Sequence, residues 1–401
     1  MNNSCEKNKL PKVALILCPL LPVPAVKGGA VENLVQILLD ENEKTPKFDF
    51  TVFSLNDEDA KREAKKYKRA KFIFISMQGW WNFLAIRLMF IINKLSPRYF
   101  GSWFSLLARK ELLKDFYDLI LIENLAIYAI PMRRKMPFAK IITHLHNRYV
   151  FCGCSREREI MGATDEFWCV SNYICEEVRS AEKGAEKNIY CLYNGIDISR
   201  FSTTISRDKR NFMRGRLGIS EGDFVFLYSG RLALEKGVKE LVEAFSIVEG
   251  CIPNAKLLIS GDVKNLPSQI LRKKRLSQNI IFSGRLPYEK MSEYLQLGDV
   301  AVLPTLIEEA FGLAFLEALC VGLPTIVTDA GGMVELAEGG NAIVVQRGEG
   351  LVERLAMAML DLYAHPEKRH ELSLKGKARA AGFSKENYWK RFVELAKRLC
   401  I

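Results

Sequence analysis

Short apolar runs rich in β-branched residues alternate along the chain with segments that repeat apolar residues at helical spacing. Such runs predict strands buried on both faces, and the helical segments between them predict crossover connections. The predicted strands are residues 13–17, 50–55, 71–75, 117–124, 140–146, 166–171, 223–230, 256–261, 279–284, 299–305, 324–330 and 342–346. The alternation is typical of an α/β protein with parallel sheets covered by helices.

The alternation pauses once, near the middle of the chain. Residues 194–197, Asn-Gly-Ile-Asp, form a turn signal, and residues 199–222 contain no predicted strand. A length of 401 residues favours two or three domains. Two strand–helix series of similar size therefore predict two facing Rossmann-like domains, with ligands bound beyond the carboxyl ends of the strands in a central cleft.

The net charge of +11 is concentrated in the first half of the chain. Residues 61–150 hold 18 Lys and Arg against 5 Asp and Glu, and the rest of the chain is close to neutral. A basic stretch predicts an anionic partner, such as phosphate groups or an acidic membrane surface. Nucleic acid is not the expected partner, because the chain carries no helix-turn-helix or RNA-binding motif.

The ten cysteines are scattered, mostly inside apolar runs, and no pair of CxxC motifs exists. This pattern predicts reduced cysteines in a cytoplasmic protein. Pro19, Pro22 and Pro24 interrupt the apolar run 13–26, which favours a buried first strand over the helical core of a signal peptide.

Two cations in the second half follow a predicted strand at the start of a helix. Arg231 and Lys236 come after the strand 223–230, where the positive end of a helix dipole disfavours cations. A bound diphosphate would make the two cations favourable at this position, because each charge-assisted contact contributes about 1.5–3 kcal/mol to its binding. The pair therefore predicts a diphosphate site.

Two acidic residues flank another predicted helix start. Glu309 lies in the loop after the strand 299–305, and Glu317 lies within the helix that opens at Gly312. Backbone N–H groups at a helix start bind anions, and carboxylates accept hydrogen bonds from sugar hydroxyls. Acidic residues at a helix start are also ordinary partners of its dipole, and spacing alone leaves this alternative open.

The first half offers weaker signals. Gly28 and Gly29 precede a predicted helix and would let the backbone approach a bound group, although they are not part of a GxGxxG motif. His144 and His146 share one face at a strand end, but no third metal ligand lies nearby in the sequence. The run 57–59 has the form of a DxD metal motif and is better explained as solvated surface. No resident metal or cofactor is expected.

Taken together, these segments resemble the group-one retaining glycosyltransferases of GT-B fold, over about residues 13–398. The resemblance is carried by Gly28-Gly29, residues 194–197, GRLALEKG (230–237), SGD (260–262), FSGRLPYEKMSEYL (282–295) and residues 304–335 with their Glu-x7-Glu signature. The stretch LPVPAVKGGAVEN also resembles the spore-coat-protein-SA-like branch. Members of this family have a C-terminal helix that crosses back, which implies domains of residues 1–195 with 384–401, and 196–383.

The resemblance implies a role for each matching residue. Arg231 and Lys236 would hold the donor diphosphate, Glu309 would contact the donor sugar, and Glu317 would bind ribose hydroxyls. His146, rather than His144, would touch the donor sugar. The base would meet the backbone near Arg285 and Leu286, and the amides of Phe311, Gly312 and Leu313 would meet the sugar and phosphate. The loop at Gly28 and Gly29 would reach the diphosphate and the acceptor. Glu123 and Asn124 would line the acceptor side.

Residues 79–95 predict an amphipathic helix whose polar arc holds Asn82, Arg87, Asn93 and Lys94. The other face is apolar and aromatic, and it fits either a protein core or a headgroup interface. The segment is too short and interrupted to span a bilayer. Because cations lie on both sides of it, residues 61–104 are a candidate contact with the anionic inner face of the cell membrane.

The predicted function is a metal-independent, retaining transfer of a hexose-type sugar from a nucleoside diphosphate donor to a glycan or lipid-linked acceptor, in polysaccharide or glycoconjugate assembly. Two alternatives remain open: a sugar-nucleotide epimerase of the same fold, and a non-catalytic coat or scaffold protein. The sequence does not specify the base, the sugar, the acceptor or the oligomeric state.

Overall fold

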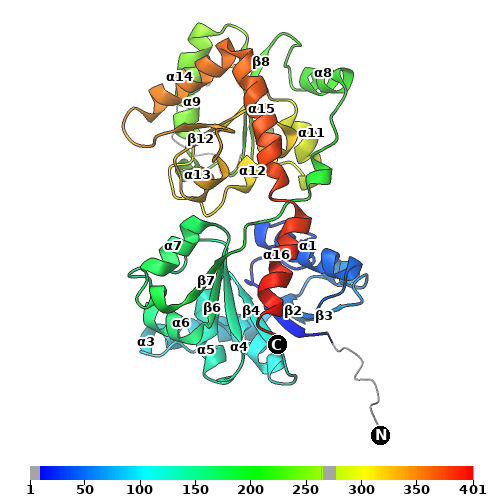
Figure 1. Cartoon of the computed structure of the whole chain (residues 1–401), viewed down its shortest axis with the longest axis vertical. Coiled ribbons are helices and arrows are strands. Elements are labelled where there is room, and N and C mark those ends of the chain that lie inside the picture. Colours follow the sequence, from blue (N-terminus) through cyan, green and yellow to red (C-terminus); the bar gives the residue numbers. More distant parts are fainter. Residues whose placement is uncertain (1–9, 263, 265–276, 401) are drawn as a thin grey trace. The chain divides into compact units, whose positions relative to one another are not determined.

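The computed structural model describes residues 10–262, 264 and 277–400, which form two compact units (Figure 1). Unit 1 comprises the chain up to Gly195 together with the residues from Lys385 onward, and unit 2 comprises Ile196–Ser384. Each unit is a parallel sheet covered by helices. The prediction of an α/β protein with two Rossmann-like domains is confirmed.

Unit 1 has a seven-stranded sheet in the order β3-β2-β1-β4-β5-β6-β7. Its strands are β1 (Lys12–Ile16), β2 (Asp49–Leu55), β3 (Ala70–Ile75), β4 (Leu119–Glu123), β5 (Ile141–Leu145), β6 (Glu166–Cys169) and β7 (Asn188–Cys191). Its main helices are α1 (Ala30–Lys44), α2 (Glu58–Ala64), α3 (Trp80–Leu95), α4 (Trp103–Leu112), α5 (Ala129–Arg133), α6 (Glu157–Ala163) and α7 (Asn172–Ser180). The strand order reverses between β1 and β4, and parallel sheets of this kind bind ligands at such a switch point.

Unit 2 has a six-stranded sheet in the order β10-β9-β8-β11-β12-β13, which reverses between β8 and β11. Its strands are β8 (Phe224–Ser229), β9 (Ala255–Ser260), β10 (Ile280–Gly284), β11 (Val300–Leu303), β12 (Thr325–Thr328) and β13 (Ile343–Val345). The helices and 3-10 turns of this unit include α8 (Arg207–Arg216), η4 (Leu234–Lys236), α9 (Val238–Cys251), η6 (Tyr288–Lys290), α12 (Leu313–Val321), α13 (Gly332–Leu336), α14 (Leu351–Ala364) and α15 (Pro366–Ala381).

Every strand predicted from the sequence is present, and one strand was missed. β7 is an edge strand of only 4 residues, none of which is fully buried. An edge strand of this kind needs no continuous apolar run, so its sequence carries little of the signal that marks the central strands.

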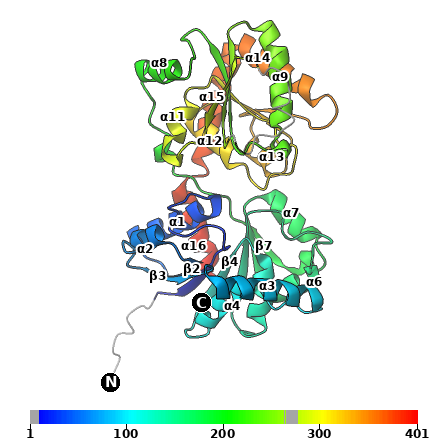
Figure 2. The same cartoon turned by 180° about the vertical axis from the view of Figure 1, so that it is seen from behind.

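The last helix, α16 (Lys385–Lys397), completes the core of unit 1, as the resemblance implies. The Phe392 ring packs edge-on against Phe48 and Trp168, with ring centroids 5.8 and 5.6 Å apart. Trp389 donates a hydrogen bond from Nε1 to Thr45 Oγ1 at 3.2 Å, just beyond the end of α1. Figures 1 and 2 both show α16 beside α1, so the two ends of the sequence share one core.

Helix α3 lies on the outside of unit 1, near α4 (Figure 2), and none of its residues is buried. Its asparagines face the protein: Asn82 Oδ1 accepts from Trp103 Nε1 at 2.8 Å, and Asn93 Nδ2 donates to the carbonyl of Gly101 at 2.8 Å. Its large apolar side chains are exposed instead. Core packing, one of the two alternatives for this segment, is therefore wrong.

Within the described residues, no helix has the length and hydropathy needed to cross a bilayer.

The run 57–59 begins α2, where Asp57 Oδ1 accepts hydrogen bonds from the amides of Asp59 and Ala60 at 3.0 Å. None of the nine described cysteines forms a disulfide bond with another described cysteine.

Candidate active site

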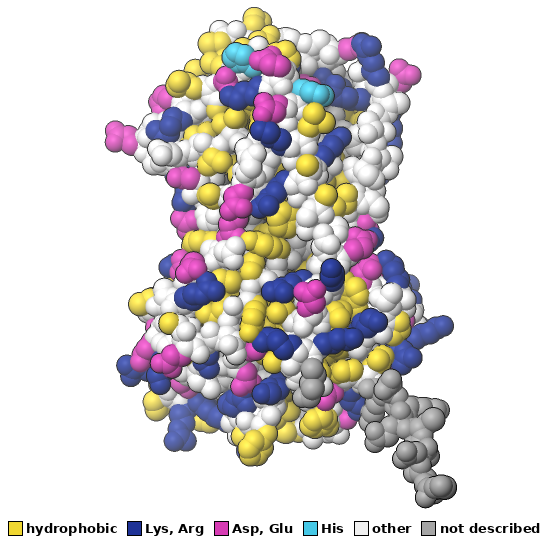
Figure 3. All heavy atoms as spheres, in the orientation of Figure 1, with side chains coloured by type: hydrophobic (Ala, Val, Ile, Leu, Met, Phe, Trp, Pro, Cys, Tyr) yellow, Lys and Arg dark blue, Asp and Glu magenta, His cyan; other side chains and the backbone are white. Residues whose placement is uncertain are grey.

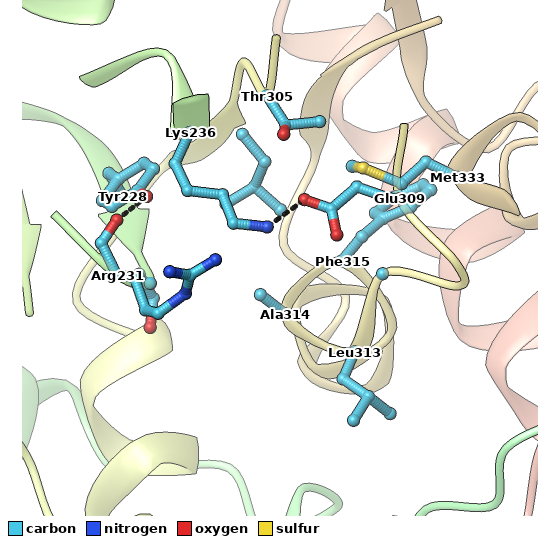
Figure 4. Close-up of a pocket in the computed structure, with 13 residues that line it drawn as sticks. Tyr228, Arg231, Lys236, Thr305, Glu309, Leu313, Ala314, Phe315 and Met333 are labelled. Carbon is cyan, nitrogen blue, oxygen red and sulfur yellow. Dashed lines mark hydrogen bonds and ion pairs between the residues drawn. The ribbon is translucent and has the colours of Figure 1, made fainter. Parts of the chain in front are cut away.

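A cavity of about 230 Å³ opens at the switch point of unit 2 (Figure 4). It is lined by the end of β8, the loops after β8 and β11, the first turn of α12 and one residue of α13: Tyr228, Ser229, Gly230, Arg231, Lys236, Leu303, Thr305, Glu309, Gly312, Leu313, Ala314, Phe315 and Met333. The structure thus brings together five residues that the sequence analysis selected, namely Arg231, Lys236, Glu309, Gly312 and Leu313.

The loops after β8 and β11 are joined by backbone contacts that fix their shape. The amide of Leu306 donates to the carbonyl of Glu235 at 2.9 Å. Gly237 has a φ of 69°, and a Cβ there would collide with the carbonyl oxygen of Pro304. Glycine is therefore required where the two loops meet, and this close approach sets Lys236 beside the β11 loop.

Three charged side chains meet in the cavity. Lys236 Nζ forms an ion pair with Glu309 Oε1, and both side chains are about four-fifths buried. Tyr228 donates from its hydroxyl to the carbonyl of Arg231 at 2.8 Å, which holds the backbone of that residue in place. Figure 4 shows the Arg231 guanidinium and the Lys236 ammonium turned toward the same open space beside Ala314. The Arg231 side chain is largely exposed, and its Nη1 lies 3.3 Å from Glu235 Oε1.

The first turn of α12 forms the other wall of the cavity. Gly312 caps this helix with a φ of 100°, and a Cβ there would come within 2.8 Å of Met333 Cγ. The helix has no acidic residue in its first turn, so its N–H groups are not neutralised by a carboxylate of the helix itself. A helix start of this kind favours a bound anion.

The neighbouring glutamates 308 and 309 have different partners. Glu308 Oε1 accepts from Arg347 Nη2 at 2.6 Å, and the same guanidinium contacts Asp329 Oδ1 at 3.1 Å. Glu308 is thus engaged on the β12–β13 side of the unit, whereas Glu309 faces the cavity. Of the two, Glu309 is the residue that a ligand in the cavity can reach.

The remaining predicted residues of unit 2 lie outside the lining of this cavity. Glu317 is within α12, where burial raises the pKa of its carboxyl to about 8. Phe311 is buried, with its ring 5.6 Å from that of Phe383. Arg285 and Leu286 follow β10, and Arg285 is exposed. The cavity alone does not assign a contact to these four residues.

The residues selected in unit 1 lie around its own switch point. Gly28 and Gly29 have φ values of 73° and 106° and lead into α1. A Cβ on Gly29 would collide with the carboxylate of Glu32. Glu32 is buried, and both burial and the charge of Glu123 raise the pKa of its carboxyl. Glu32 was not selected from the sequence, because an acidic residue in a first helical turn is ordinary.

Glu123 at the end of β4 accepts from His144 of β5 and from His146 just after it. Its Oε2 lies 3.0 Å from His144 Nδ1 and 2.7 Å from His146 Nε2, and all three side chains are buried. No third metal ligand lies close to the two histidines in the sequence, and the structure supplies Glu123. Strand register would have revealed it, since Glu123 and His144 are paired across β4 and β5.

The charge states of this cluster follow from its burial. Burial opposes ionisation of Glu123, but the two histidines outweigh it and hold the pKa of the carboxyl at about 2. Burial and His144 lower the pKa of His146 to about 4. Neutral His146 therefore donates its Nε2 proton to Glu123, which leaves Nδ1 as an acceptor with no partner among the described residues.

The same three side chains offer ligand atoms that lie within 4.8 Å of one another, a set that could hold a metal ion. Their facing atoms are already joined by the two hydrogen bonds to Glu123. The expectation of a metal-free protein remains a prediction.

Comparison with known proteins adds a family to this geometry. The family model described as "Glycosyl transferases group 1" matches residues 209–379. Spore coat protein SA of Bacillus subtilis is 24% identical over 402 residues, covering 96% of this chain and 97% of that protein. The GDP-mannose-dependent monoacylated alpha-(1-6)-phosphatidylinositol monomannoside mannosyltransferase of Corynebacterium glutamicum is 29% identical over 227 residues, which is 55% of this chain and 58% of that relative.

The solved structures support the fold. Anabaena Alr3699/HepE, in complex with UDP and glucose, matches with a TM-score of 0.73 at 19% identity, over 96% of this chain and 99% of that one. The two Rossmann-like units thus have the GT-B architecture, and residues 209–379 carry the pattern of the family model. Residues 209–379 therefore match the group 1 glycosyltransferase family, and the chain is similar to spore coat protein SA over nearly its whole length.

Proposed function

We propose that this protein is a retaining glycosyltransferase that moves a hexose-type sugar from a nucleoside diphosphate donor to a glycan or lipid-linked acceptor, in polysaccharide or glycoconjugate assembly. The observation that carries the proposal is the cavity of unit 2, where Arg231 and Lys236 stand across from the first turn of α12. Two cations and a set of helix N–H groups converge there with a single carboxylate, Glu309. A diphosphate with a sugar attached matches both kinds of group.

Donor binding would rearrange the ion pair in this cavity. With no ligand bound, Glu309 neutralises Lys236. An entering diphosphate would take over Lys236 and Arg231, each contact contributing about 1.5–3 kcal/mol. Glu309 would then be free to accept a hydrogen bond from a sugar hydroxyl. The ion pair thus keeps both groups positioned before the donor arrives.

The proposed transfer breaks the bond between the anomeric carbon and the diphosphate oxygen. Arg231, Lys236 and the helix amides would stabilise the negative charge that develops on that oxygen. The acceptor hydroxyl would attack the carbon from the same face, and its proton would pass to the departing phosphate. A double displacement instead needs two carboxylates flanking the bond, and the lining of this cavity contains only Glu309. The two cations would take the part that a divalent ion plays in other transferases, so no metal is required.

A thermal-shift panel of UDP-, GDP- and ADP-sugars tests donor binding. One of these donors should raise the melting temperature of the wild type, and Lys236→Ala should lose that shift because the diphosphate loses a cation. Lys239→Ala, three positions along the same segment, removes the same charge outside the cavity lining and should keep the shift. An equal shift in wild type and Lys236→Ala would refute the proposed role of the cavity.

Turnover tests the reaction itself. Glu309→Ala and Lys236→Ala should abolish sugar transfer while circular dichroism shows an intact fold. Donor interconversion in the absence of any acceptor would instead identify an epimerase. Binding of donor with neither reaction would indicate a protein that has kept the site and lost the chemistry.

We also propose that unit 1 rests on the anionic cytoplasmic surface of the membrane. Trp81 and Phe90 of α3 are 76% and 70% exposed, and their neighbours on the outward face are also apolar. Arg87 and Lys94 of the same helix and Arg98 in the loop after it are exposed cations close to these side chains in the sequence. Figure 3 draws the opposite face of unit 1, where Lys and Arg side chains are also interspersed with apolar ones. Aromatic residues with nearby cations suit a headgroup interface. The Corynebacterium relative is named for a lipid acceptor, which supports a lipid-linked acceptor here.

Sedimentation with anionic vesicles tests this surface. Trp81→Ser combined with Phe90→Ser should weaken vesicle binding by at least about tenfold, because each aromatic side chain contributes about 1.5–3 kcal/mol when it leaves water. Phe212→Ser combined with Met357→Ser is the control, since these side chains of unit 2 are 66% and 69% exposed. Wild-type binding by the α3 variant would exclude α3 as the contact.

A further inference from the structure

A second cavity lies in unit 1, between α3, α4, α5 and the loop that joins α3 to α4. Its volume is about 590 Å³. Four cations line it, Arg98, Arg109, Arg134 and Lys135, and no acidic residue does. The rest of the lining is apolar and includes Met89 and Ile92 of α3. A cavity of this size is within the range that holds a small ligand or a headgroup.

Three of the four cations have no carboxylate partner among the described residues. Arg109 donates from Nη1 to the carbonyl of Pro131 at 3.1 Å, and burial lowers the pKa of its guanidinium. No ion pair is formed by Arg98 or Lys135 with any described residue. Arg134 alone is paired, with Glu159 at 2.8 Å. Unpaired cations gathered around one cavity repel one another, and an anion would remove that cost.

One side of α3 lines the cavity, and the adjoining side of the same helix is exposed. Met89 and Ile92 line the cavity, while Phe90 and Ile91 beside them are 70% and 50% exposed. A ligand here would therefore meet cations at one end and an open apolar surface at the other. An anionic phospholipid has this division, with a phosphate on its headgroup and acyl chains next to it.

We propose that this cavity binds the phosphate headgroup of an anionic membrane lipid, with the acyl chains lying against the outward face of α3. The inference rests on the membrane contact proposed above and adds a defined headgroup site to it. The site is distinct from the donor cavity, which lies in unit 2. Unit 1 would thus recognise a lipid headgroup, beyond any general attraction of positive charge to a negative surface.

Vesicles of phosphatidylcholine with and without phosphatidylglycerol test the site. Arg98→Gln combined with Lys135→Gln removes two cations of the cavity that make no ion pair. We expect binding to vesicles with about one third phosphatidylglycerol to fall about fivefold for each cation, or about 25-fold for the pair. Lys140→Gln combined with Lys390→Gln removes the same charge from exposed lysines of unit 1 that lie outside the cavity lining and outside residues 61–104, and it should cost much less.

Three outcomes would overturn the proposal: wild-type binding by the cavity variant, equal losses in both double variants, or release of the vesicles by millimolar glycerol 3-phosphate. The second outcome would mean that only net charge matters, and the third would mean a site for a soluble phosphate. The vesicle assay contains no nucleotide, so a negative result there would not contradict the proposed donor cavity. A negative result in the donor panel would likewise not contradict the headgroup site.

Discussion

Glu317 is a carboxyl whose surroundings favour its protonated form. Burial raises its pKa to about 8 from an ordinary value of 4.5, and it makes no ion pair with a described residue. An acid in this state gains from any ligand that donates hydrogen bonds to its ionised form. Ribose hydroxyls, the partner that the family resemblance implies, are donors of this kind.

This raised pKa makes the stability of unit 2 fall as pH rises. Between pH 4.5 and about 8 the folded state keeps a proton that the unfolded state releases, so the contribution is complete below 4.5 and is lost above it. The loss is at most about 5 kcal/mol, at about 1.36 kcal/mol per pKa unit. Calorimetry of Glu317→Gln should show a shallower decrease of the melting temperature over this range. Parallel curves for wild type and variant would contradict the burial of an ionisable group there.

Sequence spacing correctly placed Arg231, Lys236 and Glu309 near one another, because the carboxyl ends of neighbouring parallel strands meet at one edge of a sheet. It could not pair residues that only the fold brings together. Glu308 and Arg347 are 39 positions apart, and Glu123 and His146 are 23 apart. The two adjacent glutamates look alike in the sequence, and their partners separate them: Arg347 for Glu308 and Lys236 for Glu309.

At the scale of elements, α3 shows what periodicity can and cannot predict. The apolar repeat of residues 79–95 correctly predicted a helix. It did not predict which face of α3 would turn inward, because that depends on Trp103 and Gly101, which hold its asparagines. The strand pattern predicted the layers, since buried strands need continuous apolar runs, and it missed β7 for the converse reason.

α16 should be as important to the stability of unit 1 as any internal helix. Phe392 is fully buried against Phe48 and Trp168, so Phe392→Ala should cost about 3–5 kcal/mol of the free energy of unfolding. Lys390→Ala changes an exposed position of the same helix and should stay within about 0.5 kcal/mol of the wild type. Urea unfolding followed by tryptophan fluorescence measures both. An equally small effect for Phe392→Ala would mean that α16 does not belong to this core.

At the scale of the whole molecule, the two units differ in their tryptophan content, so their unfolding can be followed by different signals. All 5 tryptophans, residues 80, 81, 103, 168 and 389, lie in unit 1, and the sequence of unit 2 contains none. The proposed donor cavity lies in unit 2. Tryptophan fluorescence therefore reports the unfolding of unit 1, and the heat absorbed in calorimetry reports both units.

A nucleoside diphosphate should stabilise the two units unequally. A ligand at 100 times its dissociation constant adds about 2.7 kcal/mol to the state that binds it. Because the residues proposed to bind the diphosphate, Arg231 and Lys236, lie in unit 2, the nucleotide should raise a calorimetric transition while the tryptophan transition of the full chain stays in place. Lys236→Ala should remove this effect and Lys239→Ala should retain it. If the nucleotide raises the tryptophan transition by the same amount, the selective stabilisation of unit 2 is refuted. Either both units then bind the diphosphate or the two units unfold as one.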